Sequence, residues 1–98
     1  MSYCYVLYSE NEDKYYIGKT TNLPRKRLKM HLTDFYEKRK YTKIADDWKI
    51  YWTIECKSIG IAGKIEKHIK KMKSRKYLEN LKIYSEIGQK LLQKYQED

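Results

Sequence analysis

Five side chains in this sequence could together act on a phosphate ester: Tyr5, Tyr16, Arg27, His31 and Glu66. Hydrolysis of such an ester requires a positioned water, a base, charge neutralisation at the phosphate and help for the leaving oxygen. An arginine can bind phosphate through two parallel hydrogen bonds, and one carboxylate can suffice to hold a Mg²⁺ that keeps several waters. Taken singly, each residue is commonplace, since a glutamate beside lysines is usually an ion-paired surface residue. Only their arrangement can indicate a function.

The spacing of these residues is compatible with a shared site. Tyr5 and Tyr16 are eleven positions apart across a polar, turn-forming stretch, so they can approach each other as cross-strand neighbours. Arg27 and His31 are four apart and would share one face of a helix. Glu66 falls in a second helical pattern, at the edge of its apolar stripe and among lysines. The order of the five therefore favours one constellation over unrelated residues.

The charge of the chain points to an anionic partner. The 98 residues carry a formal net charge of +9, and two segments, 19–43 and 57–82, each hold nine basic and two acidic residues. Lysine and arginine neutralise phosphates and release counterions, so DNA or RNA is the favoured partner. An anionic lipid surface and plain solubility are the alternatives that charge alone leaves open.

Several classes of protein are excluded by what the sequence lacks. It has no Gly-rich phosphate loop, no HExxH and no CxxC, and its apolar runs are too short for a transmembrane helix. The only cysteines, Cys4 and Cys56, fall in apolar strand-like stretches and are expected to be reduced core residues. The N-terminus lacks a basic region and a cleavage site, so we expect a cytoplasmic protein without a membrane partner.

The hydrophobic pattern predicts a single α+β domain over residues 1–98, with a small three-stranded antiparallel sheet flanked by helices. The predicted order is strand 3–8, turn 9–14, strand 15–18, a helix from Asn22 to about Phe35 or Tyr36, strand 48–56, a helix at about 61–73, a short helix capped by Ser74, and a last helix at about 84–96. The stretch Ser58-Ile59-Gly60 is expected to end the strand at 48–56 before the helix at 61–73 begins.

Two stripes define the expected core. Alternation over 48–56 predicts that one face of the strand carries five residues, namely Trp48, Ile50, Trp52, Ile54 and Cys56. Tyr51 falls on the opposite face of that strand. On the helix at 61–73 the expected buried stripe is Ile61, Ile65, Ile69 and Met72.

The segment YCYVLYSENEDKYYIGKTTNLPRKRLKMH resembles the opening of the GIY-YIG nuclease superfamily. The match consists of Tyr5, then the triplet Tyr16-Ile17-Gly18, a lysine (Lys19), a capped helix and the pair Arg27 and His31. The later stretch IAGKIEKHIKKMKSRKYLENL is similar to the family's glutamate helix, with Glu66 at the metal-binding position. The resemblance covers about residues 3–82 and is nearest to the small stand-alone members.

The sequence departs from the family pattern in three places. The first triplet reads Tyr3-Cys4-Tyr5, and the stretch between Gly18 and Arg27 is one residue longer than usual. Arg25 or Lys26 could therefore take the place of the arginine, although Arg27 retains the four-residue spacing to His31. Asn80 stands at a plausible position for the family's terminal asparagine, and Tyr77 aligns there as well.

The resemblance implies an endonuclease that hydrolyses DNA with Mg²⁺ or Mn²⁺ on Glu66. It also implies that one tyrosine activates the water, with Tyr5 preferred and Tyr16 as the alternative. Lys19 and His31 are the groups that could pass on its proton. Further basic residues would line the DNA path: Arg25, Lys26, Lys29, Lys67, Lys70, Lys71, Lys73, Arg75 and Lys76.

Such lysines and arginines position the backbone without reading sequence. We therefore expect weak sequence specificity, or specificity that comes from DNA structure, as in branched or damaged DNA, or from an oligomer. The competing hypothesis is a catalytically weak nucleic-acid-binding module that retains the fold. A small basic scaffold protein would explain the charge but not the ordered constellation. The sequence leaves the oligomeric state open.

Overall fold

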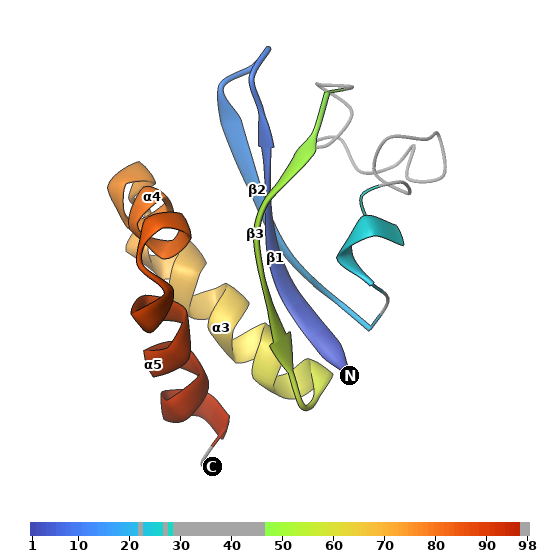
Figure 1. Cartoon of the computed structure of the whole chain (residues 1–98), viewed down its shortest axis with the longest axis vertical. Helices are drawn as coiled ribbons and strands as arrows, with labels where there is room; N and C mark the ends of the chain where they lie inside the picture. Colours follow the sequence, from blue (N-terminus) through green and yellow to red (C-terminus); the bar gives the residue numbers. More distant parts are fainter. Residues whose placement is uncertain (22, 27, 29–46, 97–98) are drawn as a thin grey trace.

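The computed structural model describes residues 1–21, 23–26, 28 and 47–96. Over these residues the chain forms a three-stranded antiparallel sheet and a group of helices, which confirms the predicted α+β class. The strand order is β2-β1-β3, so β1 is central and β2 lies at an edge. Three helices, α3, α4 and α5, lie together on one side of the sheet, with the N-terminal end of β1 and the C-terminal end of α5 at the lower part of Figure 1.

Strands β1 (Ser2–Ser9) and β2 (Lys14–Thr20) form the predicted hairpin. Each is slightly longer than the sequence pattern indicated, because the ladder continues from Tyr3 paired with Thr20 to Ser9 paired with Lys14. The turn between them contains Asp13 at a φ of 51°, a left-handed conformation that aspartate tolerates better than most residues.

Strand β3 (Lys49–Cys56) pairs with β1, but its register shifts between Val6 and Leu7. Val6 faces Trp52 and Leu7 faces Ile50, so Tyr51 is an extra residue in the ladder. Such a bulge breaks the alternation of faces. The prediction of one continuous face over 48–56 is therefore wrong.

The bulge divides the side chains of β3 between two cores. Trp52, Ile54 and Cys56 pack toward the helices, and Tyr51 joins them. Trp48 and Ile50 pack instead on the opposite face of the sheet. The alternating pattern could not reveal this change, because the bulge depends on how β1 pairs with β3.

The helices are α3 (Ile59–Met72), α4 (Arg75–Ile83) and α5 (Ser85–Gln96). Strand β3 ends before Ser58, as predicted, but α3 begins at Ile59 rather than at about Ile61. The Ser58 hydroxyl accepts a hydrogen bond from the Ile61 amide at 3.2 Å and caps the helix there. Ser74 caps α4 in the predicted way.

The buried stripe of α3 also differs at its end from the prediction. Ile65 and Ile69 are buried, but Met72 is 45% exposed and Ala62 takes part in the core instead. Met72 lies in the last turn before Lys73, where the backbone turns left-handed and ends the helix.

A hydrophobic core lies on each face of the sheet. The helix-side core contains nine buried residues, namely Cys4, Val6, Cys56, Ala62, Ile65, Ile69, Leu78, Leu81 and Leu91. The opposite core contains Tyr5, Leu7 and Trp48, against which Leu28 packs. Residues 24–26 and 28 are helical, as predicted for the start of the first helix, and the remainder of that helix lies outside the described residues. Both cysteines are buried and unbridged, as predicted.

No helix within residues 1–21, 23–26, 28 and 47–96 is long and apolar enough to cross a bilayer.

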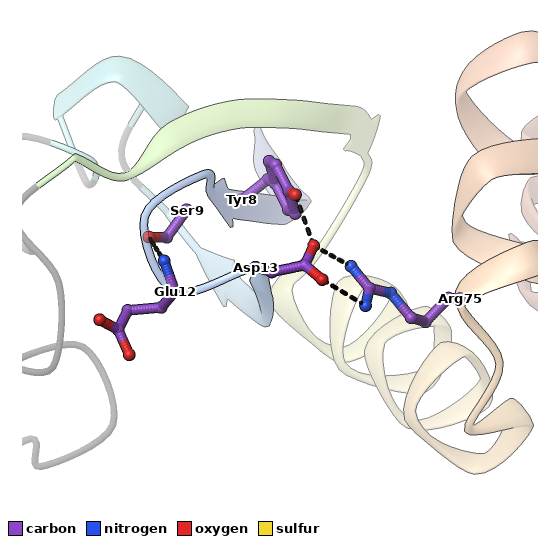
Figure 2. Close-up of polar contacts among 5 residues, drawn as sticks. All are labelled: Tyr8, Ser9, Glu12, Asp13 and Arg75. Atoms are coloured by element: carbon purple, nitrogen blue, oxygen red, sulfur yellow. Dashed lines mark hydrogen bonds and ion pairs between the residues drawn. The ribbon is translucent and has the colours of Figure 1, made fainter.

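An ion pair joins the hairpin turn to the start of α4. The Arg75 guanidinium donates two hydrogen bonds to the Asp13 carboxylate, and the Tyr8 hydroxyl donates a third at 2.6 Å (Figure 2). Arg75 also lies 5.2 Å from the centroid of the Tyr15 ring. These bonds hold the pKa of Asp13 at about 2, with the Arg75 hydrogen bonds as the largest cause.

The same turn is tied to the chain entering β3. The buried Ser9 hydroxyl donates to Asp47 at 2.6 Å and accepts from the Glu12 amide at 3.2 Å, a bond drawn in Figure 2. The Asn11 backbone N–H also donates to the Asp47 carboxylate at 3.0 Å. The hairpin turn is thus fixed at two points, one on α4 and one before β3.

The Asp13 tie predicts a pH-dependent stability. Because the folded-state pKa lies near 2, below the usual 3.8, the stabilisation is present above about pH 4 and is lost as the pH falls from 4 toward 2. Asp13→Asn keeps a residue that tolerates the left-handed turn and removes the charge. We expect this variant to unfold at lower urea than the parent protein at pH 6, with a gap that narrows between pH 4 and pH 2.

Glu10→Gln is the matched control, because Glu10 is an exposed acid in the same turn. It should shift the urea midpoint little at any pH. A gap between the Asp13→Asn variant and the parent protein that stays constant from pH 6 to pH 2 would show that the carboxylate charge does not stabilise the turn.

Candidate functional site

Strand register positions the first candidate residue. Tyr5 is fully buried, and its Cα partner on β2 is Gly18. A Cβ added to Gly18 would lie 2.6 Å from the Tyr5 hydroxyl oxygen and 2.7 Å from the adjoining ring carbon. The tyrosine ring therefore crosses the backbone of Gly18, and its hydroxyl reaches the edge strand. This contact requires a glycine, which is the physical reason for the third residue of the Tyr16-Ile17-Gly18 triplet.

Tyr16 lies on the same face of the sheet as Tyr5. Its Cα partner is Leu7, and the two tyrosine rings have centroids 6.3 Å apart at an interplanar angle of 38°. The predicted approach of the two tyrosines is thus confirmed, as diagonal rather than directly opposed neighbours. Tyr16 is only partly buried and, with Lys70 of α3, lines a cavity of about 280 Å³.

Lys19 lies on the other face of β2, toward α3. A Cβ added to Gly63 would come within 3.1 Å of the Lys19 ammonium nitrogen, so the lysine side chain lies across this glycine of the helix. Glycine in a helix interior costs roughly 0.5–1 kcal/mol relative to alanine. Glycine at position 63 therefore makes the helix less stable than alanine would, but it leaves space for the Lys19 side chain.

The side chains of β2 and α3 enclose a cavity of about 420 Å³, which we call the Glu66 pocket. Its lining residues are Lys19, Ile59, Gly60, Gly63, Lys64, Glu66, Lys67 and Lys70. Four of these are lysines and one is an acid, so the pocket has a strongly positive lining around one carboxylate. Such a lining suits a ligand that carries several negative charges.

Glu66 is held in place by its own helix. Its carboxylate forms an ion pair with the Lys70 ammonium, one turn further along α3, at 2.9 Å. The Glu66 side chain is 17% exposed, whereas that of Lys70 is 55% exposed. Because Glu66 follows the buried Ile65, it sits at the margin of the core and faces the pocket. Helix α3 thus supplies the carboxylate and most of the cations.

The donor set of the pocket fits a hard divalent cation. In the part of the chain that the structure describes, no three His, Cys, Asp or Glu side chains form a group that could enclose a metal ion. Mg²⁺ needs only one or two carboxylates, because it retains several waters and takes phosphate oxygens as ligands. The single carboxylate of Glu66 meets that requirement.

Three of the predicted site residues lie outside the described residues, namely Arg27, Lys29 and His31. Arg25 and Lys26 are exposed in the helical turn that follows β2. Asn80 is partly buried in α4, where its backbone carbonyl accepts from the Tyr84 amide at 2.8 Å.

The predicted DNA-lining residues of α3 and α4 are exposed. This group contains Lys67, Lys70, Lys71, Lys73, Arg75 and Lys76. Arg75 differs from the others, because its guanidinium is already paired with Asp13 in the tie to the hairpin turn. Lys67 and Lys70 line the Glu66 pocket itself.

Sequence reasoning missed the contributions of Gly63 and Lys64 to this site. A glycine within a helical pattern is a signal of close approach, since it lowers helix stability without an evident local reason. That signal could have singled out Gly63. Lys64 resembles its neighbouring lysines, and only the three-dimensional arrangement assigns it to the pocket.

The fold and the site together define a small α+β domain with a lysine-lined pocket beside the edge strand β2. The family model of the GIY-YIG catalytic domain matches residues 1–79 of the 98. The chain therefore belongs to the GIY-YIG family, which is a family of nucleases, and nucleic acid is the implied class of substrate. The resemblance inferred from Tyr5, Tyr16 and Glu66 is confirmed. No curated protein and no solved structure matches the chain.

The contact between Tyr5 and Gly18 can be tested by adding one methyl group. Gly18→Ala places a Cβ 2.6 Å from a hydroxyl on a fully buried ring, and such overpacking typically costs about 1–3 kcal/mol. We expect urea denaturation to give a free energy of unfolding lower by about that amount.

Gly60→Ala is the matched control. Its added Cβ would meet no atom nearer than the Ser58 hydroxyl oxygen at 3.7 Å, and alanine is favoured over glycine within a helix. This variant should be as stable as the parent protein or more so. Equal stability of the Gly18→Ala variant and the parent would refute the tight contact.

Proposed function

We propose that the protein is a divalent-metal-dependent endonuclease that hydrolyses DNA phosphodiester bonds. The observation that carries this proposal is the Glu66 pocket, where one carboxylate and four lysines line a cavity beside the edge strand of a GIY-YIG domain. The lysines offer charge neutralisation to a phosphate, and the carboxylate offers a ligand for the metal.

Mg²⁺ or Mn²⁺ is the metal that this donor set suits. Glu66 would hold it, and the bound ion would offset charge on the phosphate and the leaving oxygen. The chain itself supplies the rest of the binding site. Lys19 extends over Gly63 into the pocket from β2, opposite the carboxylate-bearing helix, and it would hold a phosphate oxygen from that side.

Two observations support assigning the water-orienting role to Tyr16. Tyr16 is partly exposed and lines a cavity with Lys70, which pairs with Glu66. Tyr5 has no exposed surface and lies beneath Gly18, so it would position Tyr16 rather than meet water. This assignment reverses the preference for Tyr5 that the sequence suggested. Arg27 and His31 keep the roles that the family resemblance implies, phosphate binding and proton transfer.

Glu66→Gln tests the proposal directly. The change removes the metal-binding charge and keeps the size of the side chain, so we expect DNA cleavage with Mg²⁺ to fall by about 10²-fold or more. Nicking of plasmid DNA and of branched DNA, with Mg²⁺ or with EDTA, measures the effect. Binding of the same DNA in EDTA should persist, because the lysines remain.

Glu79→Gln is the control for loss of one acidic charge, since Glu79 is exposed on α4 and is not among the residues that line the pocket. It should cleave like the parent protein. Absence of cleavage by the parent protein with any divalent metal, with DNA binding intact, would instead favour a binding module that retains the nuclease fold.

The two tyrosines can be separated by removing one hydroxyl at a time. We expect Tyr16→Phe to reduce the rate of single-turnover cleavage by about 10²-fold, as for loss of a group that acts on the water. Tyr5→Phe keeps the ring over Gly18 and should reduce the rate less. A larger loss for Tyr5→Phe than for Tyr16→Phe would return the role to Tyr5.

A further inference from the structure

A second cavity lies on another side of α3, between this helix and α5. It has a volume of about 580 Å³ and we call it the His68 pocket. Its lining residues are Lys64, Lys67, His68, Lys71, Lys94 and Tyr95. Lys94 and Tyr95 of α5 lie beyond the family match, which ends at residue 79, and the proposed chemistry gives them no role.

The histidine in this pocket is held by residues of two other helices. Its Nδ1 atom lies 2.9 Å from the Tyr95 hydroxyl oxygen, and the two rings meet edge to face with centroids 5.9 Å apart. The ring of Tyr77 of α4 has its centroid 6.1 Å from that of the His68 ring. His68 is therefore a partly buried polar group that contacts both α4 and α5.

The lining of the pocket is cationic throughout. Three lysines from α3 and one from α5 surround the histidine, and no acid lies among the lining residues in the described part of the chain. Lys94 also lies 5.5 Å from the centroid of the Tyr95 ring. Burial, together with the charges of Lys94 and Lys71, lowers the pKa of His68. An anion in the pocket would relieve repulsion among all these groups.

The two pockets are joined by shared residues. Lys64 and Lys67 line both the Glu66 pocket and the His68 pocket. The lysines from 64 to 71 span about 10 Å along the helix, at 1.5 Å per residue. Each strand of DNA presents a phosphate about every 3.4 Å along the duplex axis. A nucleic-acid backbone that lies along α3 could therefore place neighbouring phosphates against the lysines of both pockets.

We propose that the His68 pocket binds a backbone phosphate of the nucleic acid whose cleavage we assign to the Glu66 pocket. The proposal rests on the proposed function only in taking nucleic acid as the ligand. It extends the binding surface beyond α3 to Lys94 and Tyr95 of α5. The strand would then contact both pockets, with Lys64 and Lys67 shared between them.

A charge-matched pair of double variants tests the proposal. Lys71→Ala with Lys94→Ala removes two lysines of the His68 pocket, and Lys49→Ala with Lys57→Ala removes two exposed lysines that line neither pocket. Binding of a short fluorescent DNA duplex is measured in EDTA at several salt concentrations. We call the first double variant the pocket pair and the second the control pair. We expect the pocket pair to bind DNA about tenfold more weakly, with a slope of log affinity against log salt that corresponds to about two fewer phosphate contacts. The control pair should change less.

Lys71→Arg with Lys94→Arg keeps the charge and should restore binding. Thermal melting of every variant verifies that the fold is intact, and the arginine pair keeps the test valid if the alanine pair is destabilised. Equal losses of affinity in the pocket and control pairs would overturn the proposal, because they would show that only total charge matters.

The ring protons of His68 provide a second, independent readout. The relevant groups around the ring are Lys64, Lys67, Lys71, Tyr77, Lys94 and Tyr95. A phosphate bound among these lysines should change the NMR chemical shifts of the His68 ring protons when the DNA duplex is added in EDTA at constant pH. Inorganic phosphate is the second probe, and a shift with phosphate but none with the duplex would overturn the proposal.

The failure of this inference is distinguishable from failure of the proposed function. A chain that binds DNA through the His68 pocket without cleaving it keeps the inference and contradicts the nuclease proposal. A chain that cleaves DNA but whose pocket pair binds like the control pair does the reverse.

Discussion

Packing of helix α3 against the β1–β2 hairpin is the constraint on which the rest of the structure depends. Ile65 and Ile69 anchor the helix in the core with Cys4 and Val6 of the central strand. Once that stripe is buried, the helical repeat fixes the direction of every other residue of α3. Glu66 must then face the edge strand, and the lysines around it must line the cavities on either side. The hydrophobic contact therefore determines the geometry of the charged surface.

The hairpin has to be rigid for this arrangement to hold, because Lys19, Tyr5 and Tyr16 all belong to it. Asp13 ties its turn to α4, and Asp47 ties the same turn to the entry of β3. Both ties lie at the turn end of the hairpin, and Lys19 of the Glu66 pocket lies near the other end of β2. The Asp13–Arg75 pair is exposed, so its role is to fix orientation rather than to add a large amount of stability.

Much of this fold could be predicted from periodicity, since the strands, the helices and the pairing of the two tyrosines follow local rules. The bulge at Tyr51 could not, because it depends on a register between two strands separated by about forty residues of chain. The exposure of Met72 likewise depends on where α3 ends relative to its neighbours. Local patterns report the tendency of a segment, and the contacts between segments decide the exceptions.

The candidate site was predictable to the extent that its residue types are unusual in combination. Glu66 stood out as one acid among lysines, whereas Lys64 and Lys94 were indistinguishable from other lysines. His68 was equally unremarkable, since its significance comes from Tyr95, which is twenty-seven residues away and on another helix. Residues that gain a role only by meeting distant partners leave no mark in a single sequence.

The edge position of β2 has a consequence for how this protein behaves at high concentration. An edge strand exposes backbone groups that invite pairing with a second chain, and natural proteins often guard such edges with lysine. Strand β2 carries exposed lysines at Lys14 and Lys19, so the same charge that would receive a phosphate also discourages self-association. Salt screens that repulsion. High salt, which would weaken binding to DNA, therefore also weakens the electrostatic protection of the sheet edge against aggregation.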